Sequence, residues 1–98
     1  MSSDAFPFDL SKLNAVLREH GVAWAGLFGS AARGDMTDES DIDLLVDFAQ
    51  PKSLVAVIGL ENALSATLGR QVDLVTKAAL SPYLRDRVLS DLRVVYEA

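Results

Sequence analysis

Two aspartates, Asp41 and Asp43, carry the strongest chemical signal in this chain of 98 residues. They lie on either side of Ile42 at the start of an alternating segment, and alternate residues of a strand point to the same face, about 6.6 Å apart. Two carboxylates side by side repel each other unless a cation lies between them. Mg²⁺ accepts such oxygen ligands and leaves room for phosphate oxygens. The pair therefore predicts a magnesium site, although a lone Asp-x-Asp is more often a solvated strand end.

A Gly-Ser pair precedes these aspartates by about ten residues and follows an apolar segment. Gly29 has no Cβ, so a ligand can approach the backbone closely there. Ser30 is expected to cap a short helical turn, 31–33, and to offer its hydroxyl and a free N–H to a phosphate. Arg33 could reach a phosphate or hold the loop before Asp41, and a local ion pair fits its position at least as well. Alone, such a pair is more often an ordinary strand-to-helix turn.

A third carboxylate, Asp73, lies in the otherwise apolar stretch 72–75. A charge among strand residues is costly to bury unless it is paired or bound to a metal. If this strand lies beside that of Asp41 and Asp43, the three carboxylates converge and could hold two metal ions. Asp73 could also accept the proton of an attacking hydroxyl. An edge strand with Asp73 in water is equally compatible with the sequence.

The elements that would position these residues alternate between helix and strand patterns. Helical spacing and end signals predict main helices that begin after Asp9, Ser53 and Ser81. Strand patterns cover 22–28, 42–46, 71–76 and 93–97. This order predicts an α/β (α+β) fold, with a small mixed β-sheet of about four strands flanked by helices. The sheet is expected to be mixed because a non-helical stretch joins the first two strands.

The last main helix is expected to pack against the core through four apolar residues at helical spacing, Leu84, Val88, Leu89 and Leu92. Arg85 and Arg87 would then lie on its exposed side, in water or facing an acidic partner. The single tryptophan, Trp24, is most simply a core residue.

Length and composition limit what else the chain can be. Half of its residues are hydrophobic, and residues 1–98 are expected to form a single domain. The net charge of −5 and the scattered basic residues disfavour direct nucleic-acid binding. No apolar run approaches the roughly 20 residues of a membrane span, and Met1 to Asp4 do not resemble a signal peptide. Because the chain has no cysteine, we expect a soluble cytoplasmic protein without a membrane partner.

Together these motifs resemble a known family. The segment 29–48, GSAARGDMTDESDIDLLVDF, resembles the nucleotidyltransferase signature, a Gly-Ser followed by Asp-x-Asp. The flanking Ala32-Arg33-Gly34 and Ser40-Asp41 are similar to the minimal nucleotidyltransferase (MNT) branch. Residues 68–75, LGRQVDLV, are similar to the strand that carries that family's third carboxylate. The resemblance covers nearly the whole chain.

The resemblance implies the DNA polymerase β-like nucleotidyltransferase fold and an enzyme that transfers AMP, with ATP as co-substrate and two Mg²⁺ ions as cofactor. It implies that the catalytic and metal-binding residues are Asp41, Asp43 and Asp73. It implies that the nucleotide-binding residues are Gly29, Ser30, Arg33 and Ser40. MNT proteins often act as antitoxins, so the implied partner is a HEPN-domain ribonuclease toxin. The protein would adenylylate a hydroxyl of that toxin, expected to be a tyrosine, within a hetero-oligomer.

Two other functions remain open at this point. The same chemistry could modify a small-molecule hydroxyl, although larger relatives carry an added acceptor-binding domain that this chain lacks. Alternatively, the protein could be a non-catalytic antitoxin that inhibits its partner by binding alone. The intact acidic set disfavours binding alone, because repelling carboxylates are costly to keep without a cation.

Overall fold

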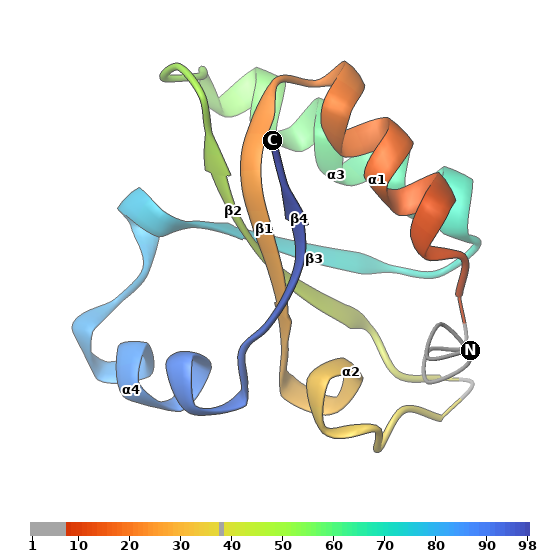
Figure 1. The fold of residues 1–98 in the computed structure, drawn as a ribbon, viewed down its shortest axis with the longest axis vertical. Coiled ribbons are helices and arrows are strands. Elements are labelled where there is room, and N and C mark those ends of the chain that lie inside the picture. The colour runs from red at the N-terminus through yellow and green to blue at the C-terminus, as the bar shows by residue number, and fades with distance from the viewer. Residues whose placement is uncertain (1–7, 38) are drawn as a thin grey trace.

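The computed structural model describes residues 8–37 and 39–98, so that Met1 to Asp4 lie outside the described residues. Helices and strands alternate along the chain (Figure 1). In chain order, the elements are α1 (Leu10–Glu19), β1 (Val22–Phe28), α2 (Gly29–Arg33), β2 (Ile42–Phe48), α3 (Leu54–Leu68), β3 (Val72–Thr76), the 3-10 turn η2 (Lys77–Ala79), α4 (Pro82–Asp91) and β4 (Arg93–Glu97). None of the described helices has both the length and the apolar character that crossing a membrane requires.

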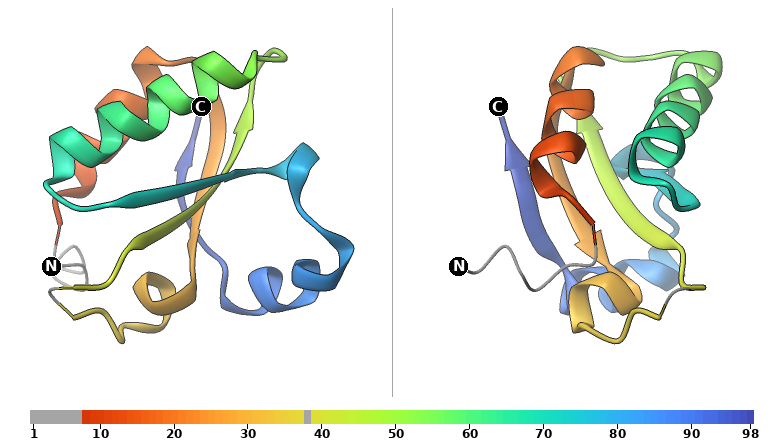
Figure 2. Two further views of the ribbon diagram at one scale, coloured as in Figure 1. Left: turned by 180° about the vertical axis from the view of Figure 1, so that it is seen from behind. Right: turned by 90° about the vertical axis from the view of Figure 1, so that its right-hand side faces the viewer.

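The four strands form one sheet in the order β3-β2-β1-β4. β1 runs antiparallel to both of its neighbours, β2 and β4, whereas β2 and β3 are parallel. The predicted mixed sheet of four strands is therefore confirmed. The parallel pairing is possible because α3 carries the chain back across the sheet between β2 and β3 (Figure 2).

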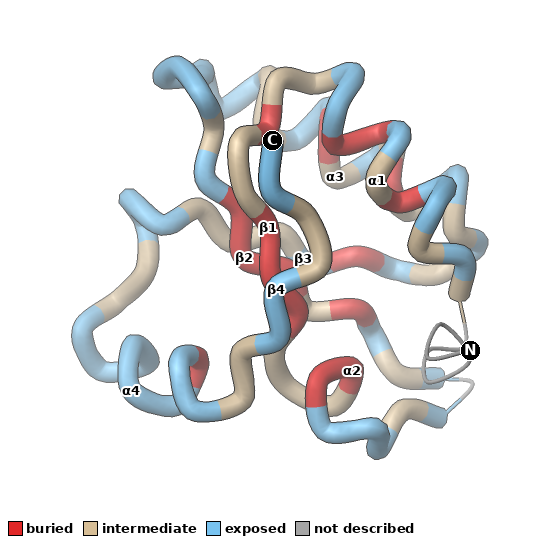
Figure 3. Tube along the Cα trace, viewed as in Figure 1, coloured by how far each residue is buried: buried red, intermediate tan, exposed pale blue. Residues whose placement is uncertain are grey.

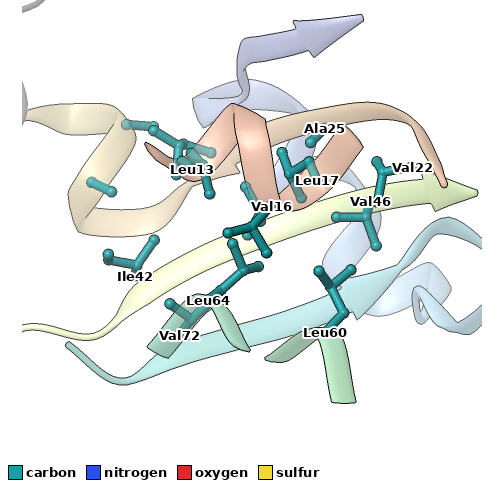
Figure 4. Close-up of a cluster of buried hydrophobic side chains, with 14 residues drawn as sticks. Leu13, Val16, Leu17, Val22, Ala25, Ile42, Val46, Leu60, Leu64 and Val72 are labelled. Atoms are coloured by element: carbon teal, nitrogen blue, oxygen red, sulfur yellow. The ribbon is translucent and has the colours of Figure 1, made fainter. Parts of the chain in front are cut away.

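The main core lies between one face of this sheet and the two helices α1 and α3, which lie side by side on it (Figures 1 and 2). Leu13 and Leu17 of α1 and Leu60 and Leu64 of α3 are fully buried there. They pack against alternate residues of β2, among them Ile42 and Val46 (Figure 4). Figure 3 shows the same division, with buried residues concentrated along the central strands and on the inner sides of these helices. The sheet is thus fixed on one face, which leaves the other face for a site.

The predicted helix starts are confirmed by side-chain caps. Asp9 accepts from the N–H of Ser11 at 2.9 Å, Ser53 accepts from that of Ala56, and Ser81 accepts from that of Tyr83. The predicted cap at Ser30 is wrong. The strand stays extended through Phe28, which is the N-cap residue of α2 without any side-chain hydrogen bond, and Ser30 lies inside the first turn.

The predicted packing of α4 is also only partly right. Val88 is buried, but Leu84 and Leu89 are each 50% exposed. The helix lies at the end of the molecule where β1 leads into α2, apart from α1 and α3 (Figure 1). Because α4 is covered on one side only, just a narrow stripe of it is buried, and the apolar pattern overstates how much of it belongs to the core.

Candidate active site

Strand alternation and register place Asp43 and Asp73 on one face of the sheet. Asp43 is paired with Phe28 of β1 on one side and with Asp73 of β3 on the other. Leu44, the next residue of β2, points into the core beneath α1 and α3. Since successive strand residues point to opposite faces, Asp43 and Asp73 lie on the face away from these helices, and Asp41 shares their side by alternation.

The three carboxylates are close enough to interact. Burial raises the pKa of Asp43, and the charges of Asp73 and Asp41 raise it further, against a smaller opposing effect of Arg33. Burial likewise raises the pKa of Asp73, followed by the charges of Asp41 and Glu61 and a hydrogen bond with Asp41. The structure therefore brings together the three aspartates singled out in the sequence.

This acidic cluster fits a divalent cation in its chemistry. Carboxylate oxygens are the ligands that Mg²⁺ prefers, and a cation would relieve the repulsion that raises both pKa values. Among residues 8–37 and 39–98, no three His, Cys, Asp or Glu side chains stand ready-arranged around one metal position. The carboxylate side chains would therefore have to reorient to surround the ion.

Gly29 makes room for one of these carboxylates. Its φ of +68° lies in the left-handed region, which side chains with a Cβ rarely adopt. A Cβ built on Gly29 would also collide with the Oδ2 atom of Asp43. The sequence predicted close approach of a ligand at this glycine, and the structure shows in addition that the side chain of Asp43 needs the same space.

A cleft of about 400 Å³ opens beside Asp43. It is bounded by residues from the end of β1, from α2, from β2 and from α4, namely Phe28, Gly29, Ser30, Arg33, Asp43, Leu84, Arg87, Val88 and Asp91. Of the predicted nucleotide-binding residues, three line this cleft and Ser40 does not. Of the three aspartates, only Asp43 lines the cleft, so the acidic cluster meets the cleft through this one carboxylate.

Arg33 joins two helices at the edge of the cleft. Its Nε donates to Asp35 at 3.0 Å, and its Nη1 donates to Asp91 of α4 at 2.8 Å. These hydrogen bonds with the two carboxylates raise the pKa of Arg33. The local ion pair considered from the sequence is therefore present, and the pair with Asp91 also fixes α4 against α2.

Ser40 organises the loop that leads into β2. Its hydroxyl accepts from the N–H of Thr37 at 2.9 Å, and its own N–H donates to the carbonyl of Thr37. Arg70 holds the same loop from the other side, because its Nη1 donates to the carbonyls of Thr37 and Ser40 at 2.9 and 3.0 Å. No sequence pattern indicated a role for Arg70, because nothing local connects it to a loop about 30 residues earlier.

The outer edge of β3, next to Asp73, is held by α3. The N–H of Val72 donates to the hydroxyl of Ser65 at 3.0 Å, and the N–H of Leu74 donates to the carboxylate of Glu61 at 2.8 Å. Two side chains of one helix thus satisfy backbone groups that an edge strand would otherwise leave open. The position of Asp73 between them follows from this attachment.

Arg87 is the second residue of the site that the sequence analysis missed. It was expected on the solvated side of α4, but it lines the cleft together with Leu84, Val88 and Asp91. These positions recur at intervals of three and four residues and therefore form one face of the helix. The spacing of Leu84, Arg87, Val88 and Asp91 is present in the sequence. Because Leu89 and Leu92 were also assigned to the core, the face of α4 that lines the cleft was not recognised.

Comparison with known proteins agrees with this geometry. Residues 10–95 match the family model described as a nucleotidyltransferase domain. Protein adenylyltransferase MntA of Thermococcus cleftensis is 47% identical over 81 residues, which cover 82% of this chain and 80% of that protein.

Two solved structures have the same fold. A crystal structure of a toxin–antitoxin with AMP-PNP superposes with a TM-score of 0.82 at 27% identity, over 92% of this chain and 74% of the matched chain. A structure of a tri-AMPylated Shewanella oneidensis HEPN toxin in complex with MNT antitoxin gives a TM-score of 0.72 at 25% identity, over 91% and 70% of the two chains.

A mixed four-stranded sheet that presents paired aspartates beside a Gly-Ser turn is the architecture of nucleotidyltransferases. With the match over residues 10–95 and the close relative, the chain belongs to the nucleotidyltransferase domain family, in its minimal branch, and is an enzyme of that class.

Proposed function

We propose that this protein is a Mg²⁺-dependent adenylyltransferase that transfers AMP from ATP to a tyrosine hydroxyl of a HEPN-domain ribonuclease and thereby acts as its antitoxin. The observation that carries the proposal is the convergence of Asp41, Asp43 and Asp73 next to the cleft that Gly29 and Ser30 line. The relative named protein adenylyltransferase and the neighbouring toxin–antitoxin structures support the choice of reaction and partner. A reaction that consumes ATP fits the cytoplasm.

In this proposal the acceptor hydroxyl attacks the α-phosphorus of ATP. A new bond forms between the acceptor oxygen and the α-phosphorus. The bond between the α-phosphorus and the oxygen that bridges to the β-phosphate breaks, and pyrophosphate leaves. Asp73 accepts the hydroxyl proton, because its carboxylate lies opposite Asp43 in the parallel register of β2 and β3. Asp41 and Asp43, with Asp73, would hold Mg²⁺, which when bound would offset the negative charge on the phosphate oxygens.

The nucleotide would be held mainly by the walls of the cleft. Ser30 offers its hydroxyl to a phosphate, and Gly29 lets the phosphate approach the backbone. Arg33 keeps α2 and α4 together through Asp91, and Ser40 fixes the loop that presents Asp41. The acceptor tyrosine would enter from the open side of the sheet, because α1 and α3 cover the other side.

The test is to incubate the protein with labelled ATP, Mg²⁺ and a purified HEPN-domain ribonuclease from the same genome, followed by mass spectrometry of the ribonuclease. We expect adenylate on a tyrosine with the wild type and none with Asp41→Asn or Asp43→Asn. Asp47→Asn is a matched control, because Asp47 lies on the same strand and face but does not line this cleft.

Two outcomes would replace the proposal. If both site variants neutralise the ribonuclease as well as the wild type does, the protein inhibits by binding alone. If wild-type protein turns over ATP but labels only a small hydroxyl compound and never the ribonuclease, the acceptor is not a protein.

A further inference from the structure

We propose that Arg87 of α4 binds the β- and γ-phosphates of the donor nucleotide in the cleft that it lines together with Asp43. The inference rests on the proposed function and adds a residue to it that neither the sequence motifs nor the relatives' names assign. Its basis is the position of Arg87 in the cleft and the absence, among residues 8–37 and 39–98, of a competing partner for its guanidinium.

The cleft is lined by Gly29 and Ser30, which follow β1, and by residues of α4. The residues that α4 contributes are one helix face, with Arg87 between Leu84 and Asp91. Arg33 ties Asp91 to α2, so this face is held toward the cleft. A phosphate chain that lies along Gly29 and Ser30 therefore has the side chain of Arg87 facing it.

The charges around the cleft single out Arg87 among the lining residues. In the part of the chain that the structure describes, two cations line the cleft, Arg33 and Arg87. The guanidinium of Arg33 is occupied by Asp35 and Asp91. For Arg87, no ion pair and no side-chain hydrogen bond with the described residues is present; only its backbone carbonyl accepts, from the hydroxyl of Ser90. Arg87 is therefore the lining cation whose donors are available to a ligand.

The chemistry of the two ends of the nucleotide explains why the β- and γ-phosphates are the target. The reacting α-phosphorus must lie by the carboxylates on the sheet, where metal and proton acceptor act. The leaving pyrophosphate carries most of the remaining charge, which Asp43 in the same cleft would repel without a cation. A planar guanidinium can donate two parallel hydrogen bonds to phosphate oxygens, which a lysine ammonium cannot match in geometry.

The test measures binding of ATP, AMP and inorganic tripolyphosphate to the full chain with Mg²⁺ by calorimetry. Arg87→Ala should weaken ATP and tripolyphosphate binding by about ten-fold or more, since a charge-assisted pair is lost, and should leave AMP binding within about two-fold. Arg87→Lys should recover part of the loss. Arg85→Ala is the matched control, because Arg85 is exposed on the same helix and does not line the cleft.

The results separate this inference from the proposed function. If the wild type binds ATP and adenylylates the ribonuclease, but Arg87→Ala binds ATP equally well, the role of Arg87 is wrong and the function stands. Equal losses for AMP and ATP would also overturn it, because the contact would then not be to the β- and γ-phosphates. If the wild type binds neither ATP nor tripolyphosphate, both ideas fail.

Discussion

Asp43 is a partly buried carboxylate beside two others, and this arrangement disfavours the folded state whenever all three are ionised. The chain keeps the arrangement although an amide of the same shape would avoid the repulsion. A conflict of this kind between stability and side-chain choice is typical of a functional position. The relation between the charge of Asp43 and stability can be tested without any substrate.

We expect Asp43→Asn to be more stable than the wild type at neutral pH without metal. The pKa of Asp43 in the folded protein is raised above its ordinary value of 3.8, so the proton is bound more tightly in the folded than in the unfolded state. The contribution of Asp43 to the free energy of unfolding of the wild type is therefore fully present below pH 3.8. It is lost as the pH rises through the pKa of Asp43 in the folded protein. The advantage of Asn should develop over that window and persist above it.

The measurement is urea denaturation of both proteins between pH 4 and 8 with a chelator present. Addition of Mg²⁺ should then favour the wild type and reduce or reverse the difference. A wild type that is the more stable protein at pH 7 without metal would contradict the repulsion argument.

Two glycines permit a matched test of the space around Asp43. Gly29 and Gly34 both have left-handed φ values, +68° and +78°, but a Cβ would strike Asp43 only at Gly29 and would meet open space at Gly34. Gly34→Ala should cost about 1–2 kcal/mol from backbone strain alone. Gly29→Ala should cost more and should also abolish ATP binding, as calorimetry would detect. Equal effects of the two substitutions on stability and on binding would show that Asp43 does not need the space.

At the scale of elements, the site depends on connections between segments that are far apart in the chain. Arg33 fixes α4 to α2, Arg70 fixes the loop before β2, and Glu61 and Ser65 of α3 fix the edge of β3. Each connection holds an element that carries a site residue. The sheet provides the common frame, because β2 in its middle carries Asp43 and lies against both neighbours.

Arg70→Ala should loosen the loop that presents Asp41. Loss of its two hydrogen bonds to carbonyls should cost about 1–2 kcal/mol in the free energy of unfolding. Amide exchange of residues 39–41 should become faster while that of β1 stays unchanged, as hydrogen-exchange mass spectrometry can measure. Arg85→Ala, which removes an exposed arginine elsewhere, serves as the control. Unchanged exchange at 39–41 would mean that the loop does not depend on Arg70.

At the scale of the whole molecule, the site exists only in the folded state, because residues from β1, α2, β2 and α4 line the cleft together. A ligand that binds this cleft must therefore stabilise the folded chain by mass action. The net charge of −5 opposes the binding of an anion, so a bound cation or the arginines at the cleft would have to compensate for it.

We expect Mg²⁺ with ATP to raise the melting temperature of the wild type by on the order of 10 °C at ligand concentrations far above the dissociation constant. Mg²⁺ alone should give a smaller rise, and Asp43→Asn should show little response to either. Differential scanning calorimetry of the full chain measures all three. A melting temperature that millimolar Mg²⁺ and ATP leave unchanged would count against a nucleotide site in this cleft.

The sequence by itself determined the local features, because each depends on residues within a few positions of one another. Alternation placed Asp41 and Asp43 on one face, side-chain caps set the helix starts at Asp9, Ser53 and Ser81, and the order of elements indicated a mixed sheet. The helix start at Ser30 failed even locally, because the extended chain of β1 continues through Phe28.

Only the tertiary structure decided which distant residues meet. The parallel register of β2 and β3 sets Asp73 opposite Asp43, a pairing that periodicity leaves open because any strand of the sheet could have been its neighbour. The same holds for α4, whose apolar residues permit several rotations of the helix about its axis. Contact with α2 through Arg33 and Asp91 selects the rotation that places Arg87 in the cleft and leaves Leu89 half exposed. Several orientations of an element are nearly equal in local free energy, and long-range packing determines which one forms. No short segment of the sequence therefore predicts the orientation.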